Sequence, residues 1–180
     1  MGSQSAAFIS LNLCGGVAVL ASYAVSIIGW PEASAKLWGQ LPETMIPYYT
    51  ANMFVAAFGY FLFTWRALRC SSAGGHRFVA GRGFGVVLAS YAATLIASAL
   101  WMPLSLYALL HEAQAMYWLI LVDLAVVAAG SLGILACMLT MSPAGSRRQR
   151  VASIVGACMF CSQTVLLDFV IWPRFFTLSG

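Results

Sequence analysis

Five long apolar stretches fill most of this 180-residue chain, and two of them carry a single aspartate each, Asp123 and Asp168. Hydrophobic residues make up 62% of the sequence and charged residues only 8%. A soluble domain typically needs about 25% charged residues to cover its surface. The sequence therefore predicts one integral membrane domain over residues 1–180. A carboxyl group is costly in lipid, so we expect each aspartate to have a specific partner or ligand.

The apolar stretches are each near or above the ~20 residues that a helix needs to cross the hydrocarbon core. They cover residues 10–29, 46–68, 83–108, 115–140 and 151–172. Lipid offers no partners for exposed backbone groups, so these stretches must be helical. We predict an all-α, multi-pass bundle of five transmembrane helices.

The basic residues predict an orientation. Seven of the nine lie in or beside the second and fourth connections, namely Arg66, Arg69, Arg77, Arg82, Arg147, Arg148 and Arg150. The positive-inside rule assigns these connections and the N-terminus to the cytoplasmic or equivalent side of the membrane. The first and third connections and the C-terminus are then outside. Because the arginines sit in short connections between apolar runs, we expect no nucleic-acid partner.

Polar and aromatic side chains recur at one depth, in the outer halves of four helices. They are Tyr49, Thr50, Asn52, Ser98, Trp101, Asp123, Gln163 and Asp168. Segment 30–45 is long enough to cover them as an ordered lid, with Trp30 and Trp38 buried against helix ends. This pattern fits a ligand pocket with apolar walls, a few placed polar groups and a cover. The alternative is that each polar group only bonds a neighbouring helix. That is the commoner role for a single residue, but for the converging set we favour the pocket.

The sequence shows no pattern typical of catalysis or metal binding. Cys158 and Cys161 could share a helix face, but His76 and His111 lie in distant connections, so a metal site lacks ligands. There is no nucleophile–base pair or phosphate-binding loop. We therefore predict a protein that is not an enzyme, holds no metal and requires no cofactor.

Residues 30–59 read WPEASAKLWGQLPETMIPYYTANMFVAAFG and resemble the first loop and second helix of the TspO/translocator protein family. The matching positions, which fall at the family's spacings, are Trp30, Lys36, Trp38, Pro42 and Pro47. Weaker matches are Tyr91-Ala92-Ala93, Leu100-Trp101-Met102-Pro103 and Leu167-Asp168-Phe169. The chain departs from the family at positions that include pocket residues, where it has Leu41, Thr50, Ser98 and Phe160.

The resemblance implies a five-helix bundle, often dimeric, that binds tetrapyrroles, sterols and synthetic aromatic molecules. Because of the departures it supports the fold more than the ligand. It adds Phe160 to the expected ligand site, and it makes a tetrapyrrole, a sterol or a lipid the expected bound molecule. A second hypothesis stays open, in which the chain is a small accessory subunit of a larger membrane complex.

Overall fold

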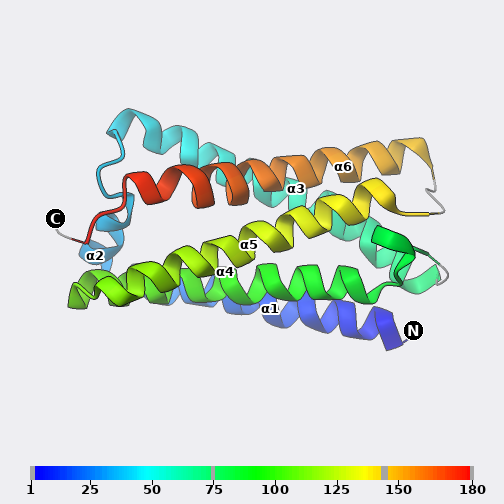
Figure 1. Cartoon of the computed structure of the whole chain (residues 1–180), viewed down its shortest axis with the longest axis horizontal. Coiled ribbons are helices and arrows are strands. Elements are labelled where there is room, and N and C mark those ends of the chain that lie inside the picture. Colours follow the sequence, from blue (N-terminus) through cyan, green and yellow to red (C-terminus); the bar gives the residue numbers. More distant parts are fainter. Residues whose placement is uncertain (1–2, 74–75, 143–145, 179–180) are drawn as a thin grey trace.

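The computed structural model describes residues 3–73, 76–142 and 146–178, which are helical apart from short connections. The long helices lie side by side along one axis (Figure 1). They are α1 (Ser3–Gly29), α3 (Ile46–Ala73), α4 (Gly85–His111), α5 (Gln114–Thr140) and α6 (Arg147–Cys161). Helix α6 continues as a π-helical segment, η4 (Ser162–Ile171), and ends in the 3-10 turn η5 (Trp172–Arg174).

Four of these helices are long and apolar enough to cross a membrane: α1, α4, α5 and the continuous segment Arg147–Arg174. They indicate a multi-pass integral membrane protein. Helix α3 has 28 residues but is not among the four. Polar residues near both of its ends, such as Asn52 and Arg66, interrupt its apolar sequence. The five-span prediction is thus supported for four helices, and a fifth crossing by α3 stays a prediction.

The helices extend beyond the apolar stretches that predicted them. Helix α1 begins at Ser3 rather than at residue 10, and α3 continues to Ala73 rather than ending at residue 68. Hydropathy marks only the apolar part of a helix, whereas backbone hydrogen bonding continues through neighbouring polar residues. The turn between α4 and α5 is sharp because Glu112 adopts a left-handed conformation with φ 47°.

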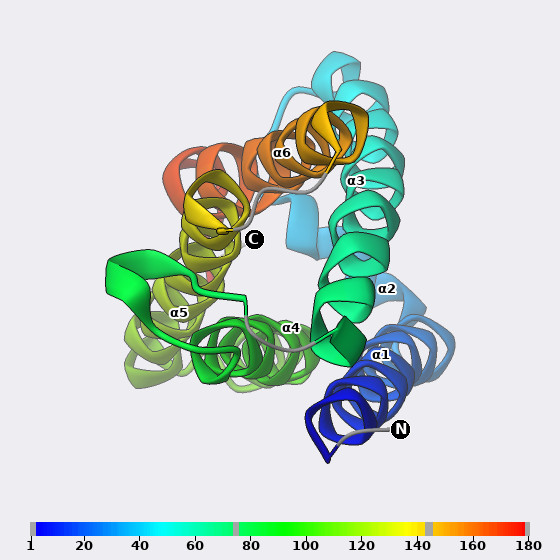
Figure 2. The same cartoon turned by 90° about the vertical axis from the view of Figure 1, so that its right-hand side faces the viewer.

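Viewed end-on, the long helices form a ring in the order α1, α4, α5, α6 and α3 (Figure 2). The N-terminus and the connections α3–α4 and α5–α6 lie at one end, which we call the arginine end (Figure 1). The opposite end holds the α4–α5 turn, segment 30–45 and the C-terminal segment, and we call it the lid end. The ring thus has two chemically different ends.

Two buried clusters fill the ring. The arginine-end core is built around Phe8, Phe63, Phe84, Tyr91 and Met138. The lid-end core is built around Leu37, Met102, Ile120, Leu124, Trp172 and Phe176.

Segment 30–45 is ordered and packs against the C-terminal segment. It contains α2 (Pro31–Ala35), η1 (Lys36–Trp38) and η2 (Glu43–Met45). The indole N–H of Trp172 donates to the carbonyl of Leu37 (2.9 Å), and the backbone N–H of Gln40 donates to the carbonyl of Phe175 (2.8 Å). Gly39 has φ 55°, and a Cβ there would collide with the Phe175 carbonyl, so this contact requires glycine.

The expected burial of the two tryptophans in this segment is only partly observed. Trp38 is half-buried, with its ring centroid 6.0 Å from that of Tyr49. Trp30 is 47% exposed, so the prediction that it buries against a helix end is wrong. It stands between the end of α1 and the start of α2 and lines a surface cavity there.

Candidate ligand site inside the bundle

The α4–α5 hairpin determines which polar side chains meet in the lid-end half. A Cβ at Gly130 would meet Ser90 and Thr94, and one at Gly133 would meet Ser90, so the two helices approach closely in antiparallel register. Followed toward the turn, this register brings Asp123 of α5 level with Trp101 of α4. Ser105 lies one helical turn from Trp101 on the same side of α4.

Three buried polar atoms in this region have no hydrogen-bond partner among the described residues. They are the indole Nε1 of Trp101, the hydroxyl oxygen of Ser105 and Oδ2 of Asp123. Ser105 is 0% exposed and Asp123 is 7% exposed. Most buried polar side-chain atoms in proteins are hydrogen-bonded, so each orphan of this kind needs an explanation. Together the three atoms offer an indole donor, a hydroxyl that donates or accepts, and a carboxyl acceptor.

Aromatic rings form the walls beside these atoms. The ring centroid of Trp101 lies 5.8 Å from that of Tyr23 on α1 and 5.6 Å from that of Trp172 on η5. The Tyr23 hydroxyl is close enough to both Asp123 and Asp168 to interact with them electrostatically. Tyr23 thus lies near both carboxyl groups, beside the ring of Trp101.

Segment η4 explains how Gln163 and Asp168 come together. In a π-helix the backbone bonds join residues five apart, and the wider turn brings side chains five apart closer to one face than an α-helix does. Gln163 Nε2 donates to Asp168 Oδ1 at 2.6 Å, a contact between residues that an α-helix would turn to different faces. π-Helical turns are rare and often occur at functional sites, and this one spans ten residues.

Hydrogen bonds connect this segment to α3. Asn52 Nδ2 donates to Gln163 Oε1 (2.9 Å), and the hydroxyl of Ser162 lies 3.2 Å from Asn52 Oδ1. The hydroxyl of Tyr49 donates to the carbonyl of Leu167 (3.0 Å), a backbone group of the irregular segment. Irregular backbone at membrane depth needs partners of this kind. The chain Asn52–Gln163–Asp168 therefore has an evident structural role, unlike the three orphan atoms.

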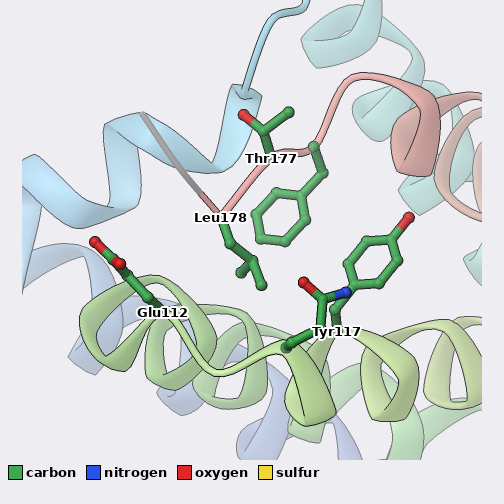
Figure 3. A pocket seen from close by; sticks show the side chains of 6 residues that line it. Glu112, Tyr117, Thr177 and Leu178 are labelled. Carbon is green, nitrogen blue, oxygen red and sulfur yellow. The ribbon is translucent and has the colours of Figure 1, made fainter.

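Two surface cavities lie at the lid end. One of about 370 Å³ opens where the C-terminal segment meets the α4–α5 turn, and Figure 3 shows Glu112, Tyr117, Thr177 and Leu178 around it. The other, of about 380 Å³, is lined by residues of 29–36 together with Leu109 and Leu110. Neither cavity includes Asp123 or Asp168 among its lining residues. The lid-end core, with Leu37, Trp172 and Phe176, is buried at the same end of the bundle.

The structure brings together some of the residues singled out from the sequence and separates others. Trp101, Asp123, Gln163 and Asp168 approach one region, and Asn52 and Tyr49 connect to it. Thr50 is exposed and bonds the Ile46 carbonyl of its own helix, and Ser98 is half-buried on α4.

Phe160 lies in the other half of the bundle. Its ring packs on Tyr60 and Phe63 beside the arginine-end core, with centroids 5.8 and 5.5 Å away. The resemblance that selected Phe160 aligns positions, whereas its packing is decided by the face of α6 on which it stands.

Three residues of the region were not selected from the sequence: Tyr23, Ser105 and Trp172. Ser105 could have been found, because it lies four residues after Trp101 and so shares its face. Tyr23 is a single tyrosine in an apolar helix, and a tyrosine at the membrane–water interface gives the same sequence pattern, so the sequence does not mark it as a site residue. Trp172 follows the π-helical segment, which changes the direction in which later side chains point. The periodicity of the sequence does not predict this change.

Among the described residues, no group of three or more His, Cys, Asp or Glu side chains could hold a metal ion. No family model, curated protein or solved structure matches the chain. The candidate site thus rests on its own geometry: one carboxyl, one hydroxyl and one indole N–H are buried with no partner among the residues described, and the indole ring packs near Tyr23 and Trp172.

Proposed function

We propose that the protein binds, and passes through or along the membrane, a flat hydrophobic molecule that carries a polar group. The chemical class is that of a tetrapyrrole or a sterol. The ligand's polar group would meet Asp123, Ser105 and Trp101, and its flat face would lie against Tyr23, Trp101 and Trp172. Ligand pockets commonly combine such apolar walls with a few placed polar atoms.

The observation that carries the proposal is the set of three buried polar atoms on two facing helices that find no partner within residues 3–73, 76–142 and 146–178. Packing alone does not explain why these positions hold polar side chains, because an apolar residue at each position would remove an unpaired polar atom from the interior. A ligand with both donor and acceptor groups would pair all three.

Further support comes from the resemblance of residues 30–59 to the TspO/translocator family, which binds ligands of this class. The ordered segment 30–45, hydrogen-bonded to the C-terminal segment, is suited to cover a site at this end. Opening of the contact between Trp172 and Leu37 would uncover the lid-end core and give a ligand a path inward.

The proposal can be tested with a pair of matched tryptophan variants. Trp101→Phe keeps a ring in place but removes the orphan N–H, whereas Trp118→Phe makes the same change at a position on α5 that is 62% exposed. The purified protein would be titrated with protoporphyrin IX and, separately, with cholesterol. Porphyrin absorption and competition by cholesterol would report binding.

We expect saturable binding of at least one probe, weakened about tenfold by Trp101→Phe, which corresponds to ~1.4 kcal/mol for one lost hydrogen bond in a buried site. Trp118→Phe should bind like the unaltered protein. Equal affinities for both variants, or no saturable binding of either probe, would contradict the proposal.

A second candidate function, as an accessory subunit of a membrane complex or as a homodimer, is favoured by α3. Its outward residues are aromatic and exposed, among them Tyr48, Phe54, Phe58, Phe61 and Trp65. The helix is also not among the four segments that are long and apolar enough to cross a membrane, which suits a protein neighbour better than lipid. A stoichiometric partner, or a mass of two chains after gentle extraction, would favour this function.

A further inference from the structure

One of the two lid-end cavities opens where two apolar helices end. It has a volume of about 380 Å³, and its lining includes Gly29 at the end of α1 and Leu109 and Leu110 in the last turn of α4. The short helix α2 forms its remaining wall (Figure 1). Helices α1 and α4 each have 27 residues and are apolar enough to cross a membrane. Such a helix is about 40 Å long, which matches a bilayer with its headgroups, so the cavity lies at headgroup depth.

Hydrogen bonds hold the wall of this cavity in place. The hydroxyl of Ser34 in α2 donates to the carbonyl of Ser26 in α1 (3.1 Å), and the backbone N–H of Trp30 donates to the same carbonyl (3.0 Å). At the other end of this wall, Leu37 is buried and its carbonyl accepts from the indole of Trp172. The backbone of residues 30–37 is therefore anchored at both ends.

The side chains that line the cavity combine both signs of charge with an aromatic ring. Glu32 and Lys36 stand four residues apart on this wall, and neither forms an ion pair with a described residue. Trp30 lines the same space and is 47% exposed. Leu109 and Leu110 add apolar surface from α4. The cavity thus offers one cation, one anion, one aromatic face and an apolar floor.

Each of these side chains has a common role that involves no ligand. A tryptophan at a helix end is often a belt residue, and charged residues in connections are mostly solvated. Glutamate and lysine four residues apart can also support a helix, but α2 has only five residues and ends at Ala35, before Lys36. None of these roles accounts for the three side chains lining one cavity at headgroup depth.

We infer that this cavity binds a phosphocholine group, which joins a phosphate to a quaternary ammonium. The ammonium of Lys36 donates to the phosphate oxygens, and the carboxylate of Glu32 faces the quaternary ammonium. The indole face of Trp30 packs on the same cation, a contact that is typical of choline recognition. Leu109 and Leu110 contact the hydrocarbon that continues from a lipid headgroup. The volume falls within the range of about 300–1,000 Å³ found for small-molecule sites.

The acidic side chain determines which headgroups are accepted. Phosphatidylglycerol carries a phosphate for Lys36 but no positive group for Glu32, so the carboxylate would face a like charge. We therefore expect phosphatidylcholine to be preferred over phosphatidylglycerol. The cavity is lined by none of Trp101, Ser105 and Asp123, so this inference does not depend on the proposed hydrophobic-ligand site.

Native mass spectrometry of the purified full chain can test the inference. The protein would be kept in a maltoside detergent, which contains neither phosphate nor choline. Phosphatidylcholine and phosphatidylglycerol with identical acyl chains would be added in equal amounts, and the retained amount of each would be measured. The variants are Lys36→Gln, Glu32→Gln and Trp30→Leu. Their matched controls change similar side chains at exposed positions and are Arg174→Gln, Glu43→Gln and Trp118→Leu.

We expect the unaltered protein to retain about threefold more phosphatidylcholine than phosphatidylglycerol, because contacts at exposed sites are individually modest. Lys36→Gln and Trp30→Leu should each lower phosphatidylcholine retention about threefold. Glu32→Gln should bring the ratio of the two lipids close to one, because it removes the charge that discriminates between them. The three controls should behave like the unaltered protein.

Soluble phosphocholine distinguishes the two sources of the group. An unfolding midpoint raised as much by phosphocholine as by phosphatidylcholine would identify the soluble molecule, and a rise with phosphatidylcholine alone would identify the lipid. Glu32 and Lys36 are exposed, so their variants should fold, which far-ultraviolet circular dichroism would check. An equal retention of both lipids by the unaltered protein would overturn the inference. So would variants that retain the two lipids just as their controls do.

Discussion

The two halves of the bundle differ in how completely they pair their buried polar groups. In the arginine-end half, Tyr91 is fully buried and its hydroxyl lies 3.0 Å from that of Thr64, while the Tyr60 hydroxyl donates to Asn12. In the lid-end half, Trp101, Ser105 and Asp123 keep polar atoms that have no partner in the described part of the chain. In the first half these side chains pair with one another, whereas we propose that a ligand pairs the three atoms of the second. This contrast separates side chains that hold the fold from the side chains of the proposed ligand site.

The largest effect on the free energy of unfolding is expected in the arginine-end half. Phe63 is fully buried and its ring packs on Tyr60, Tyr91 and Phe160. Phe63→Ala should destabilise the protein by about 3–5 kcal/mol, because it removes these contacts and leaves a cavity. Unfolding in detergent would measure it, with the exposed Phe61→Ala as control. A loss below that of Phe61→Ala would show that this core is not the main support of the bundle.

A smaller effect is expected from the hydrogen-bonded chain between α3 and η4. Gln163→Leu removes the bonds to Asn52 and Asp168, and should cost about 1–2 kcal/mol, as for interhelical hydrogen bonds in membranes. The variants Gln163→Leu and Asn52→Leu should be non-additive when combined, since both break the same bond. Additive losses in this double-mutant cycle would mean that the Asn52–Gln163 bond contributes nothing to stability.

Substitution of Asp123, whose Oδ2 has no partner among the described residues, should affect ligand binding more than stability. Asp123→Asn keeps the shape of the side chain, so we expect a change in unfolding free energy within about 0.5 kcal/mol. Porphyrin or sterol affinity should fall about tenfold, because the amide replaces one acceptor oxygen by a donor. A folded Asp123→Asn protein with unchanged affinity would remove this carboxyl from the proposed site.

The orientation of the two ends can be checked without any energetic effect. Native Cys70 is a poor reporter because it is buried against Met141. Arg148→Cys and Gln114→Cys place thiols at exposed positions of the arginine end and the lid end. In sealed cells a membrane-impermeant reagent should label Gln114→Cys and spare Arg148→Cys, with the unaltered chain as background. The reverse pattern would invert the predicted topology.

The sequence predicted helix content and depth well, and helix faces poorly. Counting residues from the ends of apolar runs brought Asp123, Gln163 and Trp101 to the same half of the bundle, because rise per residue is nearly constant. The same counting selected Thr50, which faces outward, and it overlooked Ser105. Which side of a helix turns inward depends on the register between neighbours, and here that register is determined by contacts such as those at Gly130 and Gly133.

The π-helical segment η4 also affects how the residues after it should be aligned with those of other helices. Such a segment holds more residues per turn than its α-helical neighbours, so it is equivalent to an α-helix that has accepted an inserted residue. Everything after it, including Trp172 and Phe176, is rotated relative to an uninterrupted helix. Alignments that assume one unbroken helical period will therefore match residues 172–178 to the wrong faces of related helices. An ordinary α-helix of the same length in place of residues 162–171 would turn Trp172 away from Trp101.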